Sequence, residues 1–197
     1  MSKEMIRTSF IPNAQRLTTR EKEGDGKYIE GYFVVFNELT ELWPGTFEKV
    51  APGAGDKALE ENDYRVLYNH NSDFPLGRKS AGTAKFHSDE KGIWGSVRIN
   101  EEDSAAVDAY ARVKRGDITG CSYGYWPISE SYEDNDDGSV TWTVLEADIR
   151  EFSVCTFPAY EQTEIEARSK EYRSIRENTI ERRKQRAKKR LEEITKC

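Results

Sequence analysis

Short strand-like runs separated by turn residues fill most of the chain between residues 28 and 158, and this pattern limits the fold more than any other feature. Residues 28–36 are apolar on both alternating faces, which is typical of a central strand. Two helices are predicted among the strands, at residues 56–62 and from a cap at Asp103 or Ser104 to Arg115, with Gly116 ending the second helix. The order of elements predicts an α+β fold that is predominantly β, with a closed or nearly closed β-barrel and flanking helices. The other predicted strands cover residues 5–11, 64–69, 79–86, 92–99, 117–126, 140–149 and 150–158.

Two segments between these strands are rich in turn residues. Residues 37–52 are predicted to form a loop, and the acidic residues 131–139 are predicted to form the exposed tip of a hairpin. The acidic segment lacks the full alternating carboxylates and the terminal Glu of an EF-hand, which argues against a calcium loop.

In the second helix Val107, Tyr110 and Ala111 share a face, so we expect this face to pack against the sheet.

Charge is distributed unevenly along the chain, whose net charge is -6. Residues 168–197 contain twelve Lys or Arg and five Glu, a net charge of +7, which leaves -13 for residues 1–167. We therefore expect a β-barrel domain at residues 1–167 and a basic helical or partly disordered tail at residues 168–197. Residues 171–196 contain neither Gly nor Pro, which favours a long helix. One interpretation is a solvated or partly disordered helix. The other is a docking tail that binds acidic protein or, through unspecific charge, the phosphate backbone of a nucleic acid.

Composition excludes several classes of protein. No apolar run is long enough to cross a bilayer, and the N-terminus lacks the apolar stretch of a signal peptide, so we expect a soluble protein made in a cytoplasm. The three cysteines, at positions 121, 155 and 197, have neither zinc-like spacing nor the even number of a disulfide framework, and no cofactor is predicted. Only Tyr172 offers the tail a ring for base stacking, so specific nucleic-acid recognition is not expected.

Ser122 is the candidate nucleophile. It lies between Gly120 and Gly124 in the strand-like run DITGCSYGYW at residues 117–126, where small residues let a substrate approach. A serine hydroxyl is a weak nucleophile unless a base takes its proton. The neighbouring Cys121 is a rival nucleophile. Successive strand residues point to opposite faces, so Cys121 faces the core if Ser122 faces the base.

The chain has two histidines that could supply this base. His70 follows the apolar residues 66–68 and precedes a turn-rich segment, so it lies where a buried strand reaches the surface. His87 precedes a hairpin turn at residues 88–92, which is an ordinary exposed position. His70 is therefore the candidate base.

Glu151 is the candidate orienting group. It heads the apolar run at residues 150–158, where a carboxylate has no structural role unless another group pairs with it. Strand alternation places Glu151, Ser153 and Cys155 on one face of that run. The alternative is that Glu151 ends a strand at the rim and pairs with Arg150 or a lysine.

Five segments in order resemble the prohead protease family of tailed bacteriophages, which is related to herpesvirus assemblin. They are IEGYFVVFN, YNHNSDFPLG, KGIWGSVRI, VKRGDITGCSYGYW and REFSVCTFPAYEQTEI, and they extend from about Tyr28 to Ile165. The resemblance implies a serine endopeptidase on a barrel fold, with Ser and His in the positions of Ser122 and His70. It also implies that Glu151 stands where assemblin has a second histidine.

The resemblance further implies a role in capsid maturation. The substrates would be the scaffold, the N-terminal segment of the major capsid protein and the protease itself, cleaved inside the assembling prohead in the host cytoplasm. A homo-oligomer is a possible state, and neither a membrane nor a specific nucleic acid is expected as a partner. Two other functions are consistent with the sequence: a catalytically inactive capsid-assembly or scaffolding protein recruited by its basic tail, and a nucleic-acid binding module that would rest on the tail alone.

Overall fold

The computed structural model describes residues 7–10, 17–22, 24, 26–157, 185 and 188. The chain divides into two units, residues 1–160 and 161–197, and the strands and helices named below belong to the first. The expected boundary between residues 167 and 168 and the expected tail helix lie outside the described residues, apart from residues 185 and 188, which are helical. Neither of the helices described in the first unit is long and apolar enough to cross a membrane.

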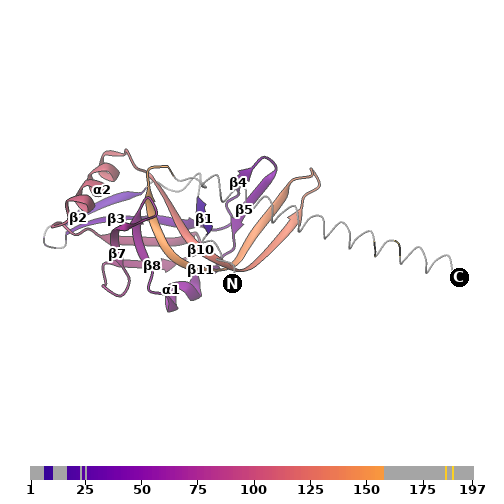
Figure 1. The fold of residues 1–197 in the computed structure, drawn as a ribbon, viewed down its shortest axis with the longest axis horizontal. Coiled ribbons are helices and arrows are strands. Elements are labelled where there is room, and N and C mark those ends of the chain that lie inside the picture. The colour runs from indigo at the N-terminus through magenta and orange to yellow at the C-terminus, as the bar shows by residue number, and fades with distance from the viewer. Residues whose placement is uncertain are drawn as a thin grey trace. The chain divides into compact units, whose positions relative to one another are not determined.

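The described strands form two sheets (Figure 1). The first sheet has seven strands: β1 (Arg7–Phe10), β4 (Thr40–Trp43), β5 (Thr46–Val50), β6 (Arg65–Tyr68), β7 (Asn71–Arg78), β10 (Gly120–Asp134) and β11 (Val140–Cys155). The second has four: β2 (Thr18–Lys22), β3 (Gly26–Val35), β8 (Ala84–Ser88) and β9 (Gly92–Arg98). The helices are α1 (Asp56–Glu61) and α2 (Ser104–Arg115).

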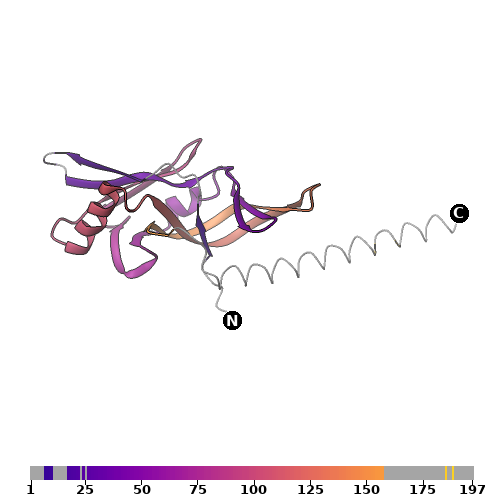
Figure 2. The same cartoon turned by 90° about the horizontal axis from the view of Figure 1, so that it is seen from above.

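The predominantly β character is confirmed, but the described strands do not close into the expected barrel. In the larger sheet the order is β1-β10-β11-β5-β4, and β6 and β7 extend from β11; in the smaller it is β2-β3-β9-β8. No described strand of one sheet pairs with a strand of the other. Within the larger sheet, β11 pairs in parallel with β5 near its start and with β6 near its end. Figure 1 and Figure 2 show β10 and β11 as one long twisted pair. This pair therefore organises the larger sheet.

An aromatic cluster joins the two sheets through the core. The ring of Phe152 on β11 stacks on Phe86 of β8 with centroids 3.9 Å apart and planes 12° apart. Phe33 of β3 and Tyr64, next to β6, meet the Phe152 ring edge-on at 5.8 Å and 5.6 Å. Stacked and edge-on rings are the preferred aromatic geometries, and all four side chains are wholly or largely buried. The cluster therefore fixes β11 at the residue that lies between Glu151 and Ser153.

Helix α2 has the predicted ends. Its N-cap is Asp103, whose carboxylate accepts the Ala105 N–H at 2.9 Å, and it ends at Gly116, which has a φ of 87°. The predicted buried face was only partly right, because Ala111 is exposed and Val107 is partly buried. The buried residues instead follow the spacing of a complete apolar stripe: Ala106, Ala109, Tyr110 and Val113.

Several other boundaries differ from the prediction. Residues 37–52 contain the hairpin β4–β5, residues 131–134 continue β10, and the turn-rich residues 71–78 form β7. The two runs at 140–149 and 150–158 merge into β11. The hairpin tip is confirmed within residues 135–139, where the Asn135 N–H donates to the Ser139 carbonyl at 2.9 Å. Whether these polar segments form strands therefore depends more on pairing with neighbouring strands than on their own β propensity.

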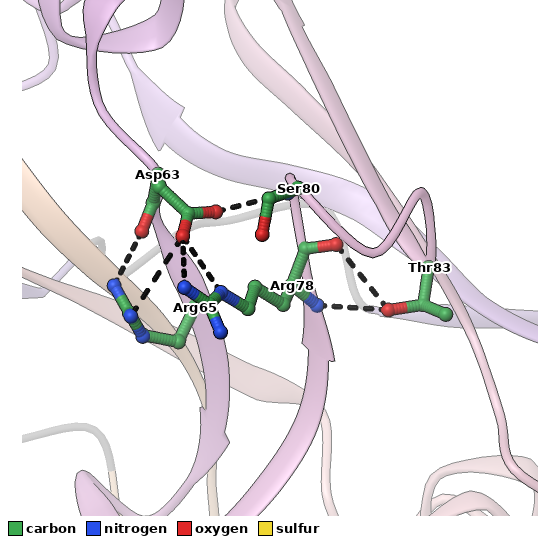
Figure 3. A network of polar contacts seen from close by, with 5 residues as sticks. All are labelled: Asp63, Arg65, Arg78, Ser80 and Thr83. Carbon is green, nitrogen blue, oxygen red and sulfur yellow. Dashed lines mark hydrogen bonds and ion pairs between the residues drawn. The ribbon is translucent and has the colours of Figure 1, made fainter.

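A polar network closes the open end of the β6–β7 hairpin (Figure 3). The Asp63 carboxylate accepts the Arg78 guanidinium at 2.7 Å and the Ser80 N–H at 2.9 Å. These two hydrogen bonds, that of Arg78 above all, hold the pKa of Asp63 well below its usual range. Arg65 donates to the Asp63 carbonyl, and the Arg78 N–H donates to the Thr83 hydroxyl at 2.9 Å. The strands that lead to His70 are thus joined at the end far from it.

Candidate active site

His70 occupies a tight turn rather than the end of a strand. Strands β6 and β7 are joined by the two residues Asn69 and His70, with Tyr68 paired to Asn71. Their φ values are 52° and 57°, and two consecutive left-handed residues in a two-residue hairpin are the mark of a type I′ turn. Glycine is the usual second residue of such a turn, so a histidine there is held in a conformation that non-glycine residues seldom adopt.

The structure brings His70 and Glu151 together across 81 positions of sequence. The Nδ1 atom of His70 lies 2.6 Å from Oε1 of Glu151, and the side chains are 30% and 13% exposed. Burial of the imidazole by itself lowers the pKa of His70, but hydrogen bonds with the Cys155 and Glu151 side chains outweigh it and raise the pKa to about 10. The raised pKa favours the imidazolium form, and the Glu151 carboxylate at 2.6 Å is one of the groups that stabilise its positive charge.

Ser122 lies on the strand next to Glu151. In the antiparallel pair β10–β11 it stands opposite Ser153, and Gly124 stands opposite Glu151. Directly opposed residues of an antiparallel pair share a face of the sheet. Ser122 therefore points to the face on which Glu151 and Ser153 meet His70, and it is only 3% exposed.

Gly124 leaves the space that the Glu151 carboxylate occupies. A Cβ atom built on Gly124 would lie 2.5 Å from Glu151 Oε1 and 3.1 Å from Glu151 Cγ, which is closer than van der Waals contact permits. The glycine thus has a steric role at this position, because its backbone lets the carboxylate pass across β10 to His70.

The rival nucleophile Cys121 and the second histidine, His87, lie in the environments that were expected. Cys121 is fully buried, its thiol donates to the Tyr32 carbonyl at 3.2 Å, and burial raises the pKa of the thiol, which disfavours the reactive thiolate. His87 is exposed on β8, with its ring 5.3 Å from that of Trp94.

Two residues of the site were not singled out by the sequence. The predicted alternation is confirmed, since Phe152 enters the core and Glu151 and Ser153 face His70. Alternation alone did not reveal that Ser153 bonds to both members of the pair or that Cys155 contributes to the raised pKa of His70. These roles depend on where the turn of Asn69 and His70 lies against β11, which the sequence does not show.

Comparison with known proteins gives the family. The family model described as the caudovirus prohead serine protease matches residues 15–178. The chain belongs to this family. The prohead protease of Enterobacteria phage HK97 is 32% identical over 149 residues, which are 73% of this chain and 62% of that protein. The chain thus spans less than two thirds of the length of that prohead protease.

A solved structure is also similar to this prohead protease family member. The capsid assembly protease of bacteriophage T4 aligns with a TM-score of 0.44 and 14% identity, over 75% of this chain and 97% of the other.

The pH dependence of stability tests the pair of His70 and Glu151. The pKa of His70 is raised from 6.5 to about 10, so the pair's contribution to the free energy of unfolding is complete below about pH 6.5 and is lost as the pH rises towards about 10. We expect the free energy of unfolding to fall more steeply over this range in the wild type than in His70→Asn, which lacks the titrating imidazole. Asparagine is the chosen replacement because it tolerates a positive φ. Urea denaturation across this pH range measures the difference, and parallel curves would contradict the pairing.

Proposed function

We propose that the chain is a serine endopeptidase of phage capsid maturation with Ser122 as nucleophile, His70 as general base and Glu151 as the group that orients the imidazole. The observation that carries the proposal is the 2.6 Å contact between His70 Nδ1 and Glu151, made from a left-handed turn position that non-glycine residues seldom occupy. Backbone conformations of this kind persist where the surroundings enforce them, and they concentrate at functional sites.

The proposed chemistry is acyl transfer. A carboxylate only accepts hydrogen bonds, so the Nδ1 proton of His70 points to Glu151 and Nε2 is left to take the proton of Ser122. The Ser122 oxygen then bonds to the peptide carbonyl carbon, and the proton passes from Nε2 to the departing amine as the C–N bond breaks. Water then gives a proton to His70 and bonds to the acyl carbon, and the proton returns to the Ser122 oxygen as the ester bond breaks and the new carboxylate leaves.

The proposed substrates are proteins of the same assembly. They are the scaffold, the N-terminal segment of the major capsid protein and the protease itself, cut inside the prohead in the host cytoplasm. Membership of a family described as prohead serine proteases supports this choice. Removal of the scaffold by hydrolysis would be irreversible, which suits a maturation step that proceeds in one direction.

Covalent labelling tests the nucleophile directly. We expect a fluorophosphonate to label the purified protein at Ser122 and the Ser122→Ala variant to remain unlabelled, while Cys121→Ser is labelled like the wild type. Peptide mapping by mass spectrometry identifies the modified residue. Label that persists in Ser122→Ala, or that disappears in Cys121→Ser, would move the nucleophile to another side chain.

Intact masses test the biological reaction. When the chain is co-expressed with its capsid protein, we expect the capsid protein to lose an N-terminal segment, and we expect Ser122→Ala to leave it at full mass in assembled shells. A capsid protein with the same mass in both experiments would favour the alternative, an inactive assembly or scaffolding protein.

A further inference from the structure

Ser153 connects the two members of the His70–Glu151 pair. Its hydroxyl donates to Glu151 Oε2 at 2.6 Å and accepts the backbone N–H of His70 at 3.2 Å. A serine hydroxyl has one proton to donate and lone pairs to accept, so both contacts are made at once. The residue is 0% exposed, and water does not compete for these bonds.

The two bonds fix different parts of the site. Glu151 uses one carboxylate oxygen for His70 Nδ1 and the other for Ser153, so the orientation of its carboxylate plane is set from both sides. The bond to the His70 N–H fixes the backbone from which the imidazole projects. A displacement of about 1 Å between catalytic groups can cost on the order of 10²-fold in rate, so a residue that holds both groups affects the chemistry without touching the substrate.

Other contacts hold the turn on β11 but do not reach the carboxylate. The Asn69 N–H donates to the Val154 carbonyl at 2.9 Å, and the Thr156 N–H donates to the Asn69 side chain at 2.8 Å. These bonds place the turn along the strand. The hydrogen bonds of Ser153, in contrast, join the backbone of His70 to the carboxylate of Glu151.

We propose that Ser153 is a positioning residue, which holds the imidazole of His70 and the carboxylate of Glu151 in register for proton transfer. This inference rests on the proposed function of the pair, and it assigns to Ser153 no contact with the substrate.

The test compares three variants. Ser153→Ala removes both bonds, and we expect kcat/KM to fall roughly 10- to 100-fold while KM changes little, because the loss concerns the proton transfer. Ser153→Thr restores a hydroxyl and should recover part of the activity. Ser96→Ala is the matched control: it removes a serine–glutamate hydrogen bond of 2.8 Å, to Glu30, in the other sheet, and we expect it to leave kcat/KM unchanged.

A second measurement does not depend on peptidase activity. The chain has two histidines, so protein labelled with ¹⁵N-histidine gives two imidazoles whose titrations can be followed by NMR, with the exposed His87 as internal reference. We expect the pKa of His70 to move down towards 6.5 in Ser153→Ala and to stay in place in Ser96→Ala, because a carboxylate that is no longer fixed holds the imidazolium less well.

The outcomes separate this inference from the proposed function. A lowered His70 titration in Ser153→Ala, together with partial recovery in Ser153→Thr, supports the positioning role even if the wild type proves inactive on every peptide. An unchanged titration in folded Ser153→Ala, or activity within about twofold of the wild type, would overturn it. If Ser153→Ala does not fold, Ser153→Thr decides the question. A pKa of His70 that falls towards 6.5 in this variant, although the hydroxyl is present, would also overturn the inference.

Discussion

We expect Glu151→Gln to lower the kcat of the proposed protease by roughly 10³- to 10⁴-fold. The carboxylate lies 2.6 Å from His70 Nδ1 and therefore selects the tautomer whose Nε2 is free to accept a proton. An amide at this position can turn its NH₂ group towards Nδ1. The ring proton then moves to Nε2, and the imidazole cannot take the proton of Ser122.

The pH profile gives the same substitution a second signature. In the wild type the pKa of His70 is raised to about 10, so the unprotonated base becomes available only as the pH rises, and kcat/KM should increase well above neutral pH. Loss of the carboxylate removes one cause of the raised pKa, so the rising limb of the Glu151→Gln profile should lie at lower pH although its maximum is much smaller.

Initial rates on a peptide substrate between about pH 6 and 10 measure both effects. Glu146→Gln is a suitable control, because Glu146 lies on the same strand and only faces Lys57 across 3.7 Å at the surface. If kcat of Glu151→Gln falls by less than about tenfold and the rising limb of its pH profile stays at the same pH, Glu151 is a structural rather than an orienting acid.

The second large effect is expected from Gly124→Ala. The added methyl would lie 2.5 Å from Glu151 Oε1, so the carboxylate has to leave His70 or β10 has to move. We expect kcat/KM to fall at least about 10²-fold and the free energy of unfolding to fall by about 1–3 kcal/mol. Enzyme kinetics and urea denaturation measure the two losses separately.

Two controls separate steric disturbance of the site from general destabilisation. Gly138→Ala puts a methyl at the tip of the β10–β11 hairpin, where no atom lies within 4 Å but the residue has a φ of 82°, so it should destabilise the fold but leave the activity per folded molecule unchanged. The double variant Gly124→Ala/Glu151→Gln should be little worse than Glu151→Gln alone, because both act on the same pair. Additive losses would mean that Gly124 acts by another route.

The sequence was most informative where one physical rule decides the outcome. The N-cap at Asp103 and the left-handed Gly116 fix the ends of α2; the sequence predicted the cap at Asp103 or Ser104 and the end at Gly116. Strand alternation correctly separated Phe152, in the core, from Glu151 and Ser153, at the site. Alternation also predicted the burial of Cys121, a consequence of the two-residue period of a strand.

The sequence was least informative where distant strands decide the conformation. Residues 71–78 resemble a turn-rich segment and become a strand only because β6 offers them a partner. Histidine has no special preference for the second position of a type I′ turn, so the sequence YNHN did not reveal the hairpin. The role of Ser153 was equally hidden, because it depends on where that turn rests on β11.

The position of Phe152 has a consequence for the response to heat. Its ring stacks against Phe86 at 3.9 Å in the interior, while its two chain neighbours, Glu151 and Ser153, form the polar contacts of the site. Because the Phe152 ring anchors this part of β11 in the core, we expect the backbone of the site to give way only when the sheets separate, so that thermal inactivation and cooperative melting occur at one temperature. A catalytic carboxylate on a surface loop would instead be lost first, in a local transition that leaves the rest of the molecule intact.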